Sequence, residues 1–233
     1  MWAIVPLKYF DDAKSRLADV LSASERQQLV RTMARDVLRA LANCAYLEGI
    51  LLNSREQEVH LLAEEFNAEI FIEPEGSNLS ESVTLASTWL EQQRKATGTL
   101  IVHADIPLAR STDFDTLLEH HRQLSLVADD EGLGTNCIAA SPPNPFEYRY
   151  DGRSFQPHLQ AARRAGISAR ICDIQGLQLD IDTAKDLSKL LVALKIAKSA
   201  GTSIGETGTY LEASGIAQRL ATPYSDNLSL IHI

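Results

Sequence analysis

Short apolar segments alternate along the chain with longer segments in which apolar residues recur every three or four positions. The short segments predict strands at residues 2–5, 49–53, 68–73, 99–105, 124–130, 137–142, 169–174 and 179–182. The longer segments predict helices at residues 22–44, 55–67, 79–95, 112–123, 155–166 and 183–200. In the first helix Leu29, Met33, Val37 and Leu41 share one face, which is the spacing of an amphipathic helix.

The repeated strand–helix order predicts an α/β fold with a mostly parallel, mixed sheet that carries helices on both faces. Ligands of such sheets bind beyond the carboxyl ends of the strands. The composition shifts to Gly, Ser and Thr after Gly201. We therefore expect one domain at residues 1–201 and a C-terminal appendage of uncertain order at residues 202–233.

The overall charge restricts the partners of the protein. The net charge is −9, which argues against nucleic acid or an anionic membrane surface. A small anionic substrate needs only a local positive pocket. Cys44, Cys137 and Cys172 lack the spacing of metal ligands or of a redox pair. We expect reduced thiols and a cytoplasmic protein, with no signal peptide and no membrane span.

The first loop, "VPLKYFDDAKSRL" at residues 5–17, places Lys8, Lys14 and Arg16 after the first strand. It contains neither the glycine pattern of a P-loop nor that of a dinucleotide site. Lysine and arginine side chains bind phosphate oxygens through charge-assisted hydrogen bonds, so this loop could hold a triphosphate. A solvated surface turn is the alternative.

Three aspartates are candidate ligands of a metal ion. Asp105 directly follows an apolar strand, and Asp180 and Asp182 lie two residues apart, which in an extended segment places both side chains on one face. Mg²⁺ prefers such oxygen ligands and would reduce the repulsion between the carboxylates. The alternatives are a turn aspartate at position 105 and a helix cap at Asp182.

Two further segments carry groups that suit an anion. In "EGLGTN" (residues 131–136) glycine N–H groups can converge on an anion while Thr135 and Asn136 add side-chain donors; a plain turn is the alternative. In "DGRSFQPH" (residues 151–158) Ser154 is expected to cap a helix whose N-terminus favours an anion. We interpret His158 as a packing or surface histidine.

A helix start at Asn78, in "EPEGSNLSES" (residues 73–82), allows two interpretations. Its side chain could contact a base or ribose, or it could cap the helix.

Taken together, "VPLKYFDDAKSRL", "EGSN", "ADIPL", "GLGTN", "RSFQPHLQAARRAGI" and "LQLDIDTAKDL" resemble the CofC/FbiD-like guanylyltransferases of coenzyme F420 biosynthesis. The resemblance covers about residues 3–195, and it implies a Rossmann-like nucleotidyltransferase fold of the glycosyltransferase-A type. That family often has glycine three residues before the serine that matches Ser154, whereas this chain has Asp151 there, followed by Gly152.

The resemblance implies transfer of GMP from GTP to phosphoenolpyruvate, 3-phospho-D-glycerate or 2-phospho-L-lactate, with release of pyrophosphate. The product would pass to a transferase that acts on the deazaflavin Fo, and the resemblance leaves room for a homodimer. The implied roles fall on the following residues. GTP would contact Lys8, Lys14, Ser15, Arg16 and Asn78; catalysis would involve Lys14, Arg16 and Asp105; one or two Mg²⁺ ions would bind Asp105, Asp180 and Asp182; the acceptor would contact Thr135, Gly152 and Ser154.

Two other classes remain open at this point. One is a different Mg²⁺-dependent nucleotidyltransferase on the same fold, of the molybdopterin or sugar-phosphate type, which nucleotide choice would distinguish. The other is a non-catalytic binding module, against which the retained aspartates argue.

Overall fold

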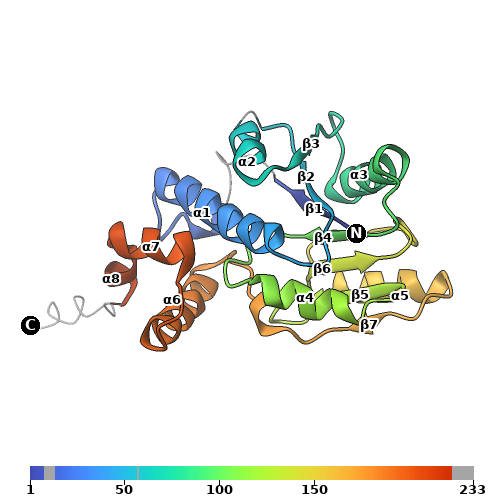
Figure 1. Ribbon diagram of the computed structural model, residues 1–233. Helices are drawn as coiled ribbons and strands as arrows, with labels where there is room; N and C mark the ends of the chain where they lie inside the picture. Colours follow the sequence, from blue (N-terminus) through green and yellow to red (C-terminus); the bar gives the residue numbers. More distant parts are fainter. Residues whose placement is uncertain (8–13, 57, 222–233) are drawn as a thin grey trace, which may run out of the picture.

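The computed structural model describes residues 1–7, 14–56 and 58–221, and they form one mixed sheet covered by helices (Figure 1). The strand order is β3-β2-β1-β4-β6-β5-β7. Within these residues only β6 runs antiparallel to its neighbours. The strands are β1 (Trp2–Pro6), β2 (Gly49–Asn53), β3 (Glu69–Phe71), β4 (Thr99–Val102), β5 (Leu124–Ala128), β6 (Thr135–Ala140) and β7 (Arg170–Ile171). The predicted mostly parallel, mixed sheet is confirmed.

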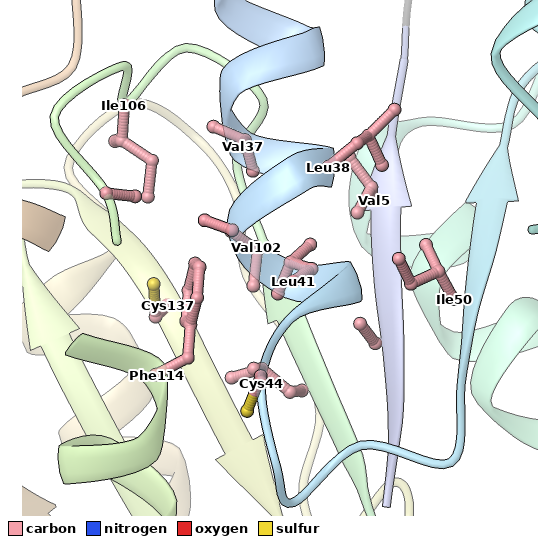
Figure 2. Close-up of a cluster of buried hydrophobic side chains, with 14 of the residues drawn as sticks. Val5, Val37, Leu38, Leu41, Cys44, Ile50, Val102, Ile106, Phe114 and Cys137 are labelled. Carbon is pink, nitrogen blue, oxygen red and sulfur yellow. The ribbon is translucent and has the colours of Figure 1, made fainter. Parts of the chain in front are cut away.

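Helices cover both faces of this sheet. Buried side chains of α1 (Ala23–Ala42), α2 (Val59–Phe66) and α4 (Ser111–Glu119) pack on one face. Those of α3 (Leu79–Arg94) and α5 (Phe155–Arg164) pack on the other. Figure 2 shows the first of these cores, where Leu38 and Leu41 of α1 and Phe114 of α4 meet the side chains of the strands.

A third core joins helices at one end of the sheet. It contains residues of α1, of the 3-10 helix η1 (Ser15–Leu17), and of the C-terminal helices α6 (Ala184–Ser199), α7 (Gly205–Ala213) and α8 (Ile216–Ala221). Leu211 and Ile216 are fully buried there. The Asp36 carboxylate of α1 accepts hydrogen bonds from the backbone N–H groups of Glu206 and Thr207 at 2.8 Å each. Residues 205–220 thus pack against the rest of the protein, while the division at residue 201 stays a prediction.

Two helices begin at residues whose side chains accept a hydrogen bond from the first turn of the helix. Ser22 caps α1 and forms a reciprocal capping box with Glu25. Thr183 caps α6 in the same way with Asp186, so the alternative in which Asp182 is the cap is wrong. The Asp182 side chain is therefore left for another role.

One predicted strand is absent from the sheet. Residues 179–182 are extended coil after the 3-10 helix η2 (Gln175–Leu177), because a single backbone hydrogen bond, from Ile181 N–H to the Asp105 carbonyl at 3.1 Å, replaces a ladder. The alternation expected of a strand survives: Ile181 is fully buried in the third core, whereas Asp180 and Asp182 line a cavity on the opposite side.

Cys44, Cys137 and Cys172 are buried free thiols. None of the helices described here combines the length and apolar character that crossing a bilayer requires.

Candidate active site

The candidate residues meet at one edge of the sheet. β4 ends at Val102, and the chain continues through His103 to Asp105. Because β6 runs antiparallel, it starts at this same edge with Thr135. A cavity of about 360 Å³ lies here, and its lining includes Arg16, His103, Asp105, Thr135, Tyr150, Gly152, Ser154, Asp180 and Asp182. The structure therefore brings together most of the residues that the sequence singled out.

Lys14 joins two of the three aspartates. Its ammonium donates to Asp105 Oδ2 and to Asp182 Oδ1, the latter at 2.6 Å. Its backbone lies in the left-handed region at φ 57° and ψ 43°, which is uncommon for a residue with a side chain. Such a conformation is kept where surrounding contacts hold it, and here the two ion pairs do so.

These contacts set the protonation of the group. Burial alone would lower the pKa of Lys14, but Asp105 and Asp182 raise it above its ordinary value. Burial alone would raise the pKa of Asp105, yet the Lys14 ammonium keeps it below its ordinary value. Asp180 has no such partner: burial and the nearby charges of Asp105 and Asp182 raise its pKa to about 7. The Asp105 carboxylate is thus ionised beside Lys14, whereas Asp180 titrates near neutral pH.

The chemistry of this donor set suits a hard cation. Oδ1 of Asp105 is buried without a hydrogen-bond partner, and the raised pKa of Asp180 reports a deficit of positive charge beside it. In the conformation described, however, no three His, Cys, Asp or Glu side chains of the described residues are grouped closely enough to hold one ion. The ammonium of Lys14 lies between Asp105 and Asp182, so a cation shared by those two would require it to move.

The residues expected to bind phosphate differ in their positions and contacts in the structure. Lys8 lies outside the described residues. Lys14 contacts carboxylates, whereas it was expected to contact phosphate. Ser15 and Arg16 are both exposed in η1, and Arg16 also lines the cavity. Among the described residues of this loop, Arg16 is therefore the cation that lines the cavity.

Two of the three expected acceptor residues, Thr135 and Ser154, are joined by a hydrogen bond. Gly152 has φ +86°, a left-handed conformation that glycine adopts without strain, and it leads the chain to Ser154. Ser154 occupies the N-cap position of α5, but its side chain makes no capping bond, so the predicted capping role is wrong. Its hydroxyl instead donates to Thr135 Oγ1 at 3.0 Å. Both side chains are almost fully buried at the base of the cavity.

The glycine loop before β6 does not leave its backbone donors open. The N–H groups of Leu133 and Gly134 both donate to the Asp129 carboxylate at 2.7 Å. Asn136 points elsewhere, because its Nδ2 donates to the carbonyls of Leu177 and Gln178 at 3.1 and 2.8 Å. The glycine N–H groups of this loop are thus used internally, that of Gly132 by the Asp129 carbonyl, and Asn136 fixes the segment that carries Asp180.

Asn78 is the N-cap of α3. Its side chain accepts from Glu81 N–H, and the Glu81 carboxylate accepts from Asn78 N–H. Asn78 also lines a second cavity, of about 790 Å³, that shares Tyr150 with the first. The capping interpretation is confirmed, and contact with GTP stays a prediction.

His103 and Tyr150 are site residues to which the sequence gave no role. Their rings lie 5.6 Å apart, and both side chains carry a buried polar atom without a hydrogen-bond partner, His103 Nε2 and the Tyr150 hydroxyl. Burial lowers the pKa of His103 and raises that of Tyr150, so both are neutral at pH 7. His103 could have been suspected from its place at the end of β4, but Tyr150 belongs to a segment without periodicity.

Solved structures share this fold. A Desulfovibrio desulfuricans protein assigned to the nucleotide-diphospho-sugar transferases matches with TM-score 0.75 at 18% identity, over 94% of this chain and 97% of the other. A cytidylyltransferase from Leptospira borgpetersenii matches with TM-score 0.57 at 11% identity, over 94% of each chain.

The mixed sheet, with carboxylates and basic residues at one edge, is a nucleotidyltransferase fold. Residues 1–201 match the model of one family, described as "Guanylyl transferase CofC like". The protein belongs to this CofC-like family of guanylyltransferases.

Curated relatives have nearly the same length. A phosphoenolpyruvate guanylyltransferase from Sphaerobacter thermophilus is 34% identical over 210 residues, which cover 89% of this chain and 98% of the relative. A 2-phospho-L-lactate guanylyltransferase from Methanobrevibacter smithii is 28% identical over 193 residues, covering 82% and 84%. These two relatives are named for different acceptor acids.

Proposed function

We propose that this guanylyltransferase transfers GMP from GTP to a phosphorylated three-carbon acid and releases pyrophosphate, as a step of coenzyme F420 biosynthesis. The carrying observation is that one cavity joins the carboxylates Asp105, Asp180 and Asp182, the cation Arg16 and the hydroxyls of Thr135 and Ser154. A charged donor and neutral hydroxyl donors in the lining of a single cavity suit two anionic substrates that react with each other. The names of the relatives supply the acid class: phosphoenolpyruvate or 2-phospho-L-lactate, with 3-phospho-D-glycerate as a third candidate.

The reaction needs no general base. An oxygen of the acceptor phosphate is already ionised at neutral pH and attacks the α-phosphorus of GTP in line. The new P–O bond forms while the bond to the β-phosphate oxygen breaks and pyrophosphate leaves. Catalysis then consists of positioning and of stabilising negative charge. In this proposal Arg16, Lys14 and Lys8 contact the GTP phosphates, with Ser15 beside them.

The aspartates would hold Mg²⁺. Asp105, Asp180 and Asp182 are the proposed ligands, and one or two bound ions would supply neutralising charge to the phosphates. Release of Lys14 from Asp105 and Asp182 would free its ammonium for phosphate. The nucleoside would occupy the larger cavity beside Asn78, which shares Tyr150 with the smaller one. Thr135, Gly152 and Ser154 would contact the acid.

The biological setting is part of the same proposal. The guanylylated acid is a labile anhydride, so we propose that a transferase acting on Fo consumes it in the cytoplasm. A homodimer stays a prediction.

The test is pyrophosphate release from GTP and Mg²⁺ with each acid in turn, coupled to the Fo transferase so that the product is trapped. Release with one acid, and with GTP in preference to CTP, supports the proposal. Release with CTP instead would point to another nucleotidyltransferase activity. No release with any acid, while GTP still binds, would refute the acceptor class.

A variant pair ties the activity to the cavity. Asp180→Asn should lower the rate at least ~100-fold, the scale seen when one preorganised electrostatic group is lost. The matched control is Asp173→Asn, an exposed aspartate in the same segment of the chain. Equal rates in the two variants would remove Asp180 from the site.

A further inference from the structure

His158 lies behind the Thr135–Ser154 pair. It follows Ser154 by four residues on α5, so the two side chains share one face of the helix. The sequence favoured a packing or surface role, but the residue is fully buried and both of its ring nitrogens are bonded. Aromatic rings surround it, with the Tyr150 centroid at 4.9 Å and that of Phe146 at 5.9 Å.

The hydrogen bonds of the ring fix its tautomer. The backbone N–H of Arg149 lies 2.9 Å from His158 Nε2, and because that group can only donate, Nε2 accepts and carries no hydrogen. Burial lowers the pKa of His158 to about 4, so the ring is neutral at pH 7. A neutral ring without hydrogen on Nε2 carries it on Nδ1. Nδ1 lies 3.0 Å from Thr135 Oγ1 and therefore donates to it.

This direction determines what Thr135 can offer to a ligand. Its oxygen accepts from His158 Nδ1 and from the Ser154 hydroxyl, which uses both of its lone pairs. The hydrogen of the Thr135 hydroxyl remains, and the residue lines the cavity. In the other tautomer Nδ1 would accept that hydrogen, and the donor would be lost from the cavity.

We infer that His158 is a positioning residue that makes the Thr135–Ser154 pair a hydrogen-bond donor to an anionic oxygen of the acceptor acid. The inference rests on the proposed function for the identity of the ligand. The hydrogen-bond chain itself, from Arg149 through His158 to Thr135, stands on the geometry. An O–H donor suits a carboxylate, which only accepts, and a charged acceptor strengthens the bond.

The tautomer can be measured without substrate. In the full chain labelled with ¹⁵N in its histidine rings, long-range ¹H–¹⁵N correlations distinguish the two neutral tautomers from imidazolium. The signal of His158 is assigned by its loss in His158→Asn. We expect a neutral ring at pH 7.5 with hydrogen on Nδ1. A ring with hydrogen on Nε2, or a charged ring, would overturn the inference.

The second measurement is binding of phosphoenolpyruvate, 3-phospho-D-glycerate and 2-phospho-L-lactate by calorimetry, with Mg²⁺ and GTP affinity recorded separately. His158→Leu should weaken binding of the preferred acid about 10- to 100-fold, the cost of losing a hydrogen bond to a charged group. GTP affinity should change less than about twofold. His158→Asn retains an N–H donor near the place of Nδ1 and should recover much of the loss.

A matched histidine controls for structural damage. His121 also joins two hydroxyl groups, Ser125 Oγ at 3.0 Å and Ser141 Oγ at 3.1 Å, but at the opposite edge of the sheet. His121→Leu and His121→Asn should leave affinity for the acid unchanged. If His158→Leu does not fold, His158→Asn and the tautomer still decide. Parallel loss of affinity for GTP and acid in His158→Asn, or no loss in either His158 variant, would overturn the positioning role.

The outcomes separate this inference from the proposed function. Acid binding that depends on His158, without pyrophosphate release, would refute the reaction and keep the positioning role. Guanylyl transfer together with an acid affinity that does not change in the His158 variants would support the reaction and refute the positioning role. Binding of none of the three acids would overturn both.

Discussion

The ionisation of Asp180 makes the site a source of instability that can be measured. Its pKa is raised from 3.8 to about 7 in the folded protein by burial and by the nearby Asp105 and Asp182 carboxylates. The unfolded chain retains the lower value. As pH rises between these values, the unfolded chain loses a proton that the folded chain keeps, so the free energy of unfolding decreases. Asp180→Asn removes this titration.

The expected size follows from the shift. Each pKa unit corresponds to about 1.4 kcal/mol, so the full difference is about 4 kcal/mol as an upper bound. Asp180 is only half-buried and borders the cavity, where screening and relaxation reduce the effect, and we expect about 2 kcal/mol. The variant should differ least from the wild type near pH 4, where the folded carboxyl is protonated and the unfolded one is only about half ionised. It should be more stable above pH 8.

The assay is urea unfolding in EDTA from about pH 4.5 to pH 8.5, with unchanged m-values as evidence that the two proteins unfold alike. The exposed Asp173→Asn serves as control and should follow the wild type at every pH. A difference between Asp180→Asn and the wild type that does not vary with pH would refute the reasoning. The same variant should lose activity, so this one substitution would increase the stability of the protein and decrease its catalytic rate.

Three further predictions concern other parts of the protein. Arg16→Ala should weaken GTP binding, measured by calorimetry, at least about tenfold with little effect on acid binding, because a charge-assisted bond to phosphate is lost. The control is Arg122→Ala, an exposed arginine at the opposite edge of the sheet. Equal effects of the two substitutions would contradict the role of Arg16. Asp36→Ala should cost about 1–2 kcal/mol in urea unfolding and speed amide exchange at the start of α7, because its carboxylate caps that helix; unchanged exchange there would contradict the capping role. Leu211→Ala should cost about 2–5 kcal/mol, since the side chain is fully buried in the third core; a cost near zero would show that α7 contributes little to the fold.

The periodicity of the sequence predicted the sheet and its helices well because those elements depend on local pattern. Strand β1 and helix α1 follow from the spacing of apolar residues, which is a property of neighbouring positions. Residues 179–182 were harder, because an extended segment becomes a strand only if a partner strand offers a ladder. Here the partner is a loop with a single backbone bond, and nothing in local sequence specifies that.

The site was predictable in its members and not in its contacts. Asp105 and Thr135 were identifiable from their places beside apolar strands at the edge where ligands bind, and Asp180 from its spacing of two residues from Asp182. Their partners come from distant parts of the chain: Lys14 for Asp105, His158 for Thr135 and Asn136 for Asp180. Spacing within one segment carries no information on such pairs. A sequence can therefore identify a candidate site residue without showing which residue it bonds to.

The charge of the cavity explains why Lys14 contacts aspartates although the sequence suggested phosphate. With an ionised Asp105 and an Asp180 that titrates near pH 7, the Lys14 ammonium is, among the described residues, the cation that contacts these aspartates directly and offsets their charge. A phosphate chain would add more negative charge to the same place, so its binding is favourable only if cations enter with it. Once they do, the carboxylates no longer need Lys14, and its ammonium becomes available to the phosphates. Under the proposed function, the expectation drawn from sequence and the contact seen in the structure would then describe two charge states of one site.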